Sequence, residues 1–193
     1  LAKMIRGNMA SEQKAVVKAA PRPQAAQESG KLPAHAQGML ADILDAYFVI
    51  QDALSQDSTD SLNEPASTIA KKASSLHDMN MPGMEAFSQT FGDDLAQISQ
   101  LAQQLETERD LKKDRQYFYD ISIALTKIIQ STGVPPTVHV EVQQLHCPMY
   151  KSGQGGSVWL QPAGDVKNPY LGSRMLECFD ERAALPVAGE DSP

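Results

Sequence analysis

Between about Gln37 and Gln130 the apolar residues recur every three or four positions, which is the spacing of amphipathic helices. Polar stretches divide this region into four segments, each with one apolar face. The expected faces are Leu40, Ile43, Leu44, Tyr47, Ile50 and Leu54 in the first segment; Leu62, Ile69, Ala73 and Leu76 in the second; Leu95, Ile98, Leu101 and Leu105 in the third; and Phe118, Ile121, Leu125 and Ile128 in the fourth. Each segment is therefore predicted to be a helix that buries one face.

The signals for helix ends agree with this division. Ser61-Leu-Asn-Glu64 has the form of a capping box at the start of the second helix. The charges of Asp93-Asp94 suit the start of the third helix, and a fourth helix from about Asp110 ends at Gly133. Because four amphipathic helices with short connections are typical of an antiparallel bundle, residues 38–134 are predicted to form one.

After Pro136 the helical period gives way to alternation. Val138, Val140 and Val142 alternate with polar residues as in a strand, and a second strand is expected at 157–161 after a glycine-rich turn. We therefore expect a small β-hairpin within residues 135–181, packed on the bundle through Trp159 and Tyr170. The predicted fold class is mainly α, a four-helix antiparallel bundle followed by a small C-terminal β-hairpin, with a disordered tail over 182–193.

Residues 1–37 have a different composition. The stretch 18–30 is rich in Ala, Pro and Gln without an apolar period, so it is predicted to be a flexible linker after an N-terminal stub. Because the chain begins at Leu1 rather than methionine, we expect a processed product or a fragment of a longer protein.

The charge of the chain narrows the classes of partner. A formal net charge of -7 argues against a nucleic-acid binder, which needs a basic face, and against docking on an anionic membrane. No apolar run is long enough for a membrane span. The two cysteines, Cys147 and Cys178, are too few for a disulfide scaffold or an all-cysteine zinc site.

The C-terminal cysteines lie beside methionines in two short arms. One arm carries Cys147 and Met149, and the other carries Met175 and Cys178. Thiolate and thioether sulfurs are soft donors that select copper(I) over harder cations. Because Met175 and Cys178 are three residues apart, a helical turn would place them on one face. We therefore expect a copper(I) or silver(I) site.

The histidines offer additional donors to this site. His139 and His146 precede Cys147 in the chain, and an imidazole nitrogen is a borderline donor. Two cysteines with two methionines already make a full donor set, so both histidines are optional members of the predicted site.

The same two cysteines have a second interpretation. In an oxidising compartment they would form a structural disulfide, which would stabilise the fold by roughly 3 to 4 kcal/mol in the chain-entropy model. Met149 and Met175 would then fill gaps in the core. Spacing alone does not separate a disulfide from a metal site, and the two can be redox states of one pair.

A second group of soft donors lies between the second and third helices. His77, Met79, Met81 and Met84 are close together in a loop with Pro and Gly, and they are possible auxiliary metal ligands. The competing interpretation is a loop whose methionines cover the end of the bundle.

Catalysis is not indicated. The chain has no catalytic triad pattern, phosphate-binding loop or metalloprotease helix motif, so it is not expected to be an enzyme. A thiol–disulfide oxidoreductase is the weakest of the interpretations because no C-x-x-C pair is present.

These motifs together resemble those of a known family. The chain resembles the C-terminal accessory domain of periplasmic adaptor proteins, the membrane-fusion subunits of heavy-metal efflux systems of the resistance-nodulation-division class. The resemblance covers about residues 39–180. It is carried by Cys147-Pro-Met149, Trp159-Leu160, Asn168-Pro-Tyr170, Gly172, Met175 and Cys178, with weaker matches at Tyr47–Leu54, Arg115, Phe118 and Ser122. The family usually has a glycine after the second cysteine, where this chain has Phe179.

The resemblance implies a location and partners. It implies a periplasmic domain associated with the cell envelope, with an efflux pump and an outer-membrane channel as partner components. It also implies that the bound ion is copper or silver, captured by the domain or passed toward the pump. The alternative is a metal-free interaction module of the adaptor, held by a Cys147–Cys178 disulfide.

Overall fold

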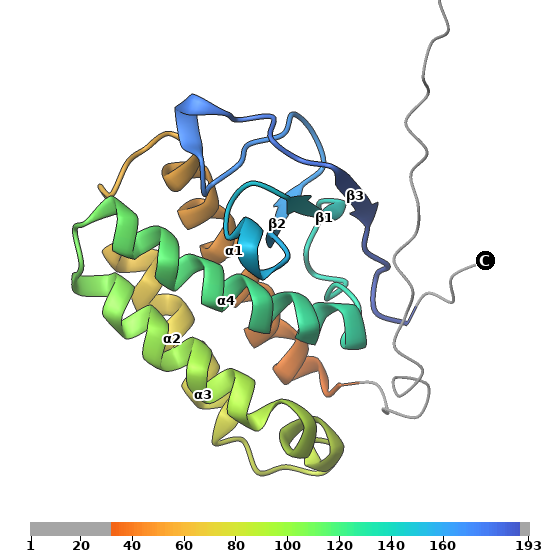
Figure 1. Cartoon of the computed structure of the whole chain (residues 1–193). Helices are drawn as coiled ribbons and strands as arrows, with labels where there is room; N and C mark the ends of the chain where they lie inside the picture. The colour runs from red at the N-terminus through yellow and green to blue at the C-terminus, as the bar shows by residue number, and fades with distance from the viewer. Residues whose placement is uncertain (1–31, 190–193) are drawn as a thin grey trace, which may run out of the picture.

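The computed structural model describes residues 32–189, which form four helices followed by a small antiparallel sheet (Figure 1). The helices are α1 (Ala34–Ser55), α2 (Asn63–His77), α3 (Glu85–Thr107) and α4 (Leu111–Thr132). The strands are β1 (Val142–Cys147), β2 (Ser157–Pro162) and β3 (Glu181–Ala184), and the 3-10 turns are η2 (Ser152–Gln154) and η3 (Gly172–Arg174). The predicted mainly helical fold class is confirmed.

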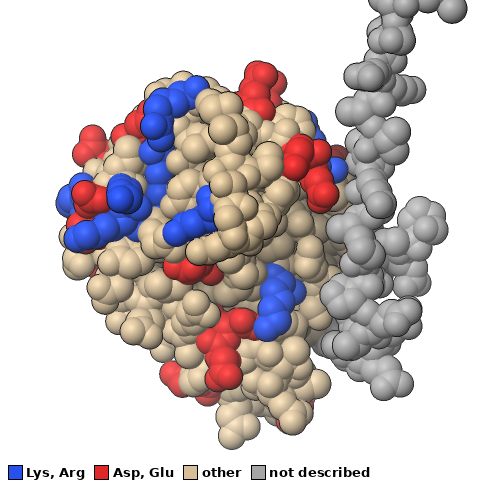
Figure 2. Space-filling model, in the orientation of Figure 1, with Lys and Arg blue, Asp and Glu red and all other residues tan. Residues whose placement is uncertain are grey.

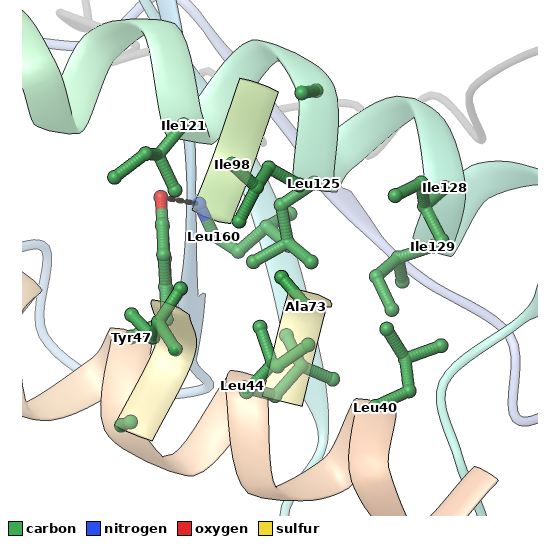
Figure 3. Close-up of a cluster of buried hydrophobic side chains, with 14 of the residues drawn as sticks. Leu40, Leu44, Tyr47, Ala73, Ile98, Ile121, Leu125, Ile128, Ile129 and Leu160 are labelled. Carbon is green, nitrogen blue, oxygen red and sulfur yellow. Dashed lines mark hydrogen bonds between the residues drawn. The ribbon is translucent and has the colours of Figure 1, made fainter. Parts of the chain in front are cut away.

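The apolar faces predicted from periodicity form the core of the bundle. All of these residues are buried except Leu101, which is half-buried. Figure 3 shows Leu40 and Leu44 of α1 facing Leu125 and Ile128 of α4. Each fully buried Leu or Ile side chain contributes roughly 1.5–3 kcal/mol, so these faces account for much of the stability of the bundle.

Two predicted helix starts are wrong. The third helix begins at Glu85 rather than at Asp93, because Phe87 and Phe91 extend its buried face toward the N-terminus. Asp94 lies inside α3 and pairs with Lys127 of α4 at 2.6 Å. The first helix begins at Ala34, so its first turn belongs to the segment that was predicted to be linker. The rest of the predicted linker, residues 1–31, lies outside the described residues.

The predicted capping box of the second helix is also absent. Leu62, not Ser61, is the N-cap of α2, and no side chain caps this end. Ser61 has a φ of 62°, and the full burial of Leu62 shows that apolar packing sets the start of the helix. The limits of α4 are close to those predicted: Asp110 accepts a hydrogen bond from the N–H of Lys113 at 2.9 Å, and Gly133 follows the last turn with a φ of 79°.

The sheet contains the predicted hairpin and one additional strand. Its order is β2-β1-β3, and both strand pairs are antiparallel. The first strand begins at Val142 rather than at Val138, because a turn closed by the Val138 N–H and the Pro135 carbonyl precedes it.

The predicted disordered tail is wrong for residues 182–189. Here β3 pairs with β1, and Val187 forms a bridge with Val134 after the end of α4. Ala183 and Leu185 are buried, so the segment contributes to the core. Residues 190–193 lie outside the described residues.

The sheet packs against α4 and α1 through buried aromatic side chains. Trp159 and Tyr170 are fully buried, as predicted, with ring centroids 6.1 Å apart. The Tyr47 hydroxyl accepts a hydrogen bond from the N–H of Leu160 in β2 at 3.2 Å (Figure 3). It lies 2.7 Å from Ser122 of α4, so one hydroxyl connects α1, α4 and the sheet.

The surface is mixed in charge. On the face drawn in Figure 2, acidic and basic side chains are interspersed across a largely uncharged surface. No helix among the described residues is both long and apolar enough to cross a membrane.

Candidate soft-metal site at the cysteine pair

The two cysteine arms meet at one end of the sheet. Cys147 is the last residue of β1, so its arm continues directly from that strand. Cys178 precedes β3, which pairs with β1, and the N–H of Asp180 donates to the carbonyl of His146 at 3.1 Å. The strand that sequence reasoning missed is thus the element that brings the second arm to the first.

The two thiols are close together and not bonded. The Cys147 and Cys178 Sγ atoms are 3.5 Å apart, and both cysteines are free. A disulfide would require about 2.05 Å. Two sulfurs that are each about 2.3 Å from one shared ion lie roughly 3.5–4.5 Å apart, depending on the angle between them. The observed separation therefore fits a pair of donors for one ion.

Exposure increases from the thiols to the thioethers. Cys147 is 0% exposed and Cys178 is half-buried, whereas Met149 is 57% exposed and Met175 is 45% exposed. The N–H of Cys178 donates to the carbonyl of Met175 at 3.2 Å, so the second arm is a tight turn, although Met175 does not have a helical conformation. The methionines are not core residues, which removes the interpretation that they fill gaps.

Asn168 holds the second arm in place. Its side chain is fully buried, and its Nδ2 donates to the carbonyl of Cys178 at 2.7 Å. Its Oδ1 accepts from the N–H groups of Tyr170 and Leu171 at 2.9 and 3.0 Å. Sequence reasoning identified a turn here but not this role, because the partner lies ten residues away in the chain.

An ion pair attaches the same loop to the bundle. Arg115 of α4 donates to the Pro169 carbonyl at 2.8 Å and to Asp57 Oδ1 at 2.5 Å. The other oxygen of Asp57 accepts from the N–H of Ser173 at 3.1 Å. Hydrogen bonds from Ser173 and Arg115 hold the pKa of Asp57 below its usual value. The loop before the second arm is therefore fixed to α4 and to the turn that follows α1.

Burial affects the chemistry of the more accessible thiol. It raises the pKa of Cys178 to about 11, and the neighbouring Cys147 acts in the same direction, while the backbone N–H of Met149 opposes both. Cys178 is thus a neutral thiol at pH 7, and a metal ion that binds it must displace a proton.

His146 does not offer a free nitrogen to the site. Its Nε2 lies 2.8 Å from the Gly155 carbonyl, and its Nδ1 lies 2.6 Å from a carboxylate oxygen of Asp180. Burial lowers the pKa of His146, but the hydrogen bonds to Asp180 and Gly155 outweigh it, and the net shift is upward. Because adjacent strand residues point to opposite faces, His146 connects the two arms from the face opposite Cys147.

His139 lies apart from the cysteines. It is exposed and precedes β1, whereas Cys147 is the last residue of that strand. Six strand residues span about 17 Å at 3.4 Å per residue. His139 and Cys147 are therefore not brought together.

The methionine-rich loop lies at the far end of the bundle. Met84 is buried, Met79 and Met81 pack partly buried against the core, and the ring of His77 lies 2.9 Å from Asp78. Gly83 of this loop lies against Pro33, the residue before α1. The arms lie beyond the other end of α1, whose 22 residues span about 33 Å.

The donors present suit a soft ion rather than a hard one. Among residues 32–189, no three His, Cys, Asp or Glu side chains gather in a way that could hold a metal ion. The other sulfur donors that the two arms offer beside the cysteine pair are the thioethers of Met149 and Met175. Ser157 lies directly opposite Cys147 in the sheet, and its buried hydroxyl has no hydrogen-bond partner in the described part of the chain. This hydroxyl could donate to a metal-bound thiolate.

Residues 43–137 match a family described as "Protein of unknown function (DUF3347)". The match covers the larger part of α1 and all of α2, α3 and α4, just under half of the 193 residues, and it ends before β1. No curated protein and no solved structure matches the chain. The cysteine arms lie outside the matched segment, so their function must be inferred from their own chemistry.

Proposed function

We propose that the two arms bind one copper(I) or silver(I) ion, with Cys147 and Cys178 as thiolate donors. The observation that carries this proposal is the 3.5 Å separation of two free thiols that both have a methionine within three residues on the same arm. Soft monovalent ions prefer sulfur donors, and the arms present thiol and thioether groups together.

The methionines would complete the donor set. Met149 and Met175 are exposed, and a methionine side chain has three rotatable bonds, so either thioether can turn toward the cysteine pair without disturbing the core. The histidines take no part in this proposal, because His146 has partners at both nitrogens and His139 lies beyond the other end of β1.

The test is an oxygen-free titration with copper(I) in competition with a chromogenic chelator. We expect one ion per chain in the wild type, about 100-fold weaker binding in Cys147→Ser and Cys178→Ser, and about tenfold weaker binding in the double variant Met149→Leu/Met175→Leu. The matched control is Met79→Leu/Met81→Leu at the far end of the bundle, which should bind as tightly as the wild type.

The folding of the variants is checked by circular dichroism. Cys178 lies on an exposed turn, so its substitution remains informative if the loss of the buried Cys147 unfolds the chain. Unchanged copper(I) affinity in a folded Cys178→Ser variant would refute the proposal.

We further propose that this domain serves a periplasmic adaptor of a heavy-metal efflux system, with the pump and the outer-membrane channel as partners. Support comes from the resemblance of the arm motifs, in which Asn168 and Gly172 are the residues that hold the second arm. The test is the copper and silver tolerance of cells that express the natural gene with Cys147→Ser/Cys178→Ser. Tolerance should fall with that change and stay constant with Met79→Leu/Met81→Leu.

A metal-free interaction module with a permanent Cys147–Cys178 disulfide makes the opposite prediction. Thiol titration of protein prepared from the periplasm separates the two functions. Free thiols that copper(I) protects support the metal site. A blocked pair that neither reductant nor copper(I) affects would support the interaction module.

A further inference from the structure

We infer that Cys178 is a site of thiol–disulfide exchange, for which Cys147 is the resolving thiol. This inference goes beyond the proposed metal site, because it concerns the metal-free protein and needs no metal ion. Its substrate class is a disulfide, R–S–S–R, presented by another molecule.

The two thiols differ in their access to solvent. Cys147 is fully buried at the end of the central strand β1, with Ser157 of β2 directly opposite. Cys178 is half-buried on a turn whose neighbours Leu176 and Glu177 are exposed. An incoming disulfide can therefore reach the sulfur of Cys178 but not that of Cys147.

The surroundings of Cys178 favour apolar disulfides. Met175, Leu176 and Phe179 belong to the exposed large apolar side chains of the described residues, and all three lie on the same arm as Cys178. The acidic side chains of Asp180 and Glu181 follow on the exposed surface. An uncharged disulfide flanked by apolar or aromatic groups fits this surface better than an anionic one.

The second thiol is close enough to complete the reaction. The Sγ atoms need to approach by about 1.5 Å to reach the 2.05 Å bond length of a disulfide. Asn168 holds the Cys178 carbonyl, and the N–H of Asp180 donates to the His146 carbonyl, so the backbone keeps the two cysteines next to each other. Rotation of the two cysteine side chains can supply the approach.

The reaction has two balanced steps. In the first, the Cys178 thiol loses its proton to solvent and its sulfur attacks R–S–S–R, which forms a Cys178–S–S–R bond and releases R–S⁻. In the second, Cys147 loses its proton, attacks the Cys178 sulfur and releases the second R–S⁻. The two thiols are oxidised by two electrons, and the incoming disulfide is reduced to two thiolates.

The test uses metal-free protein and dithiodipyridine, an uncharged aromatic disulfide that releases a coloured thiopyridone. The wild type should release two thiopyridones per chain and become lighter by two hydrogen atoms, with no adduct. Cys147→Ser should release one and retain a stable adduct. Cys178→Ser, whose only thiol is buried, should react more slowly than Cys147→Ser by about tenfold or more until it is denatured.

A second measurement needs no variant. Wild-type protein is treated with less than one equivalent of iodoacetamide, which cannot be displaced, and the modified cysteine is identified by peptide mapping. Cys178 should carry nearly all of the label. Equal labelling of both cysteines, or equal rates for the two folded variants, would overturn the inference.

These outcomes are independent of the metal site. Asymmetric exchange without copper(I) affinity would leave the inference standing and refute the proposed function. Copper(I) affinity in a protein whose two cysteines exchange equally, or not at all, would support the proposed function and refute the inference.

Discussion

At the scale of single residues, Gly172 shows why the second arm has its particular sequence. Its φ of 58° lies in the left-handed region, and a Cβ at this position would collide with Asp57 and Arg115. The close approach allows the ion pair between Asp57, which follows α1, and Arg115 of α4 to reach the loop. Glycine is therefore required twice, once for its backbone conformation and once for its lack of a side chain.

The first prediction follows from this close approach. Gly172→Ala should lower the free energy of unfolding by about 2–4 kcal/mol, because the ion pair must separate or the loop must move. The measurement is equilibrium unfolding in urea. The control is Gly153→Ala, since a Cβ at Gly153 has no atom within 4 Å. An equally small effect at both positions would contradict the role assigned to Gly172.

The residues of the candidate site were only partly predictable. Donor chemistry identified Cys147, Met149, Met175 and Cys178, and the structure brings the two cysteines together. It also gives both nitrogens of His146 other partners. Such partners are set by the fold across distant parts of the chain, so a list of donors in sequence order cannot reveal them.

At the scale of elements, the helices were predictable and the last strand was not. Long amphipathic segments repeat their signal over several turns, so their buried faces were identified although the starts of α1 and α3 were not. The strand β3 has only four residues, Glu181–Ala184, without the β-branched or aromatic residues that usually indicate a strand. Its structure depends on pairing with β1, which is a tertiary effect.

The second prediction tests the missed strand. A chain that stops after Asp180 loses β3, the buried Ala183 and Leu185, and the bridge at Val187. We expect it to be several kcal/mol less stable, because one edge of β1 loses its backbone hydrogen bonds and buried apolar area is exposed. A chain that stops after Gly189 keeps every described contact and should unfold at the wild-type temperature. Equal melting temperatures of the two truncated chains would contradict a structural role for β3.

At the scale of the whole molecule, one buried carboxyl couples stability to pH. Asp114 of α4 is fully buried, and neither of its oxygens has a hydrogen-bond partner in the described part of the chain. Burial, with a contribution from the charge of Glu108, raises the pKa of Asp114 from 3.8 to about 6. The folded state therefore binds this proton more tightly than the unfolded state does.

The third prediction follows from the sign of this shift. The contribution of Asp114 to stability is fully present below about pH 4 and is lost as the pH rises through about 6. Asp114→Asn should therefore be more stable than the wild type at pH 7.5, by about 1–3 kcal/mol, and this difference should shrink toward pH 4. Thermal unfolding across this pH range measures it, with the exposed Asp93→Asn as control. If the stability advantage of Asp114→Asn over the wild type grew toward low pH, it would contradict a raised pKa of Asp114 in the folded state.

The C-terminal segment also determines where the two ends of the described chain lie. Val187 bridges to Val134 just after α4, at the end of the bundle where Pro33 precedes α1. The chain thus enters and leaves the described fold at the same end of the bundle. The cysteine arms lie at the C-terminal end of β1 and beside the start of α4 (Figure 1). Both ends of the described fold are therefore separated from the cysteine arms by about the length of the bundle, so the part of the molecule that carries the candidate sulfur site is not the part where the chain enters and leaves.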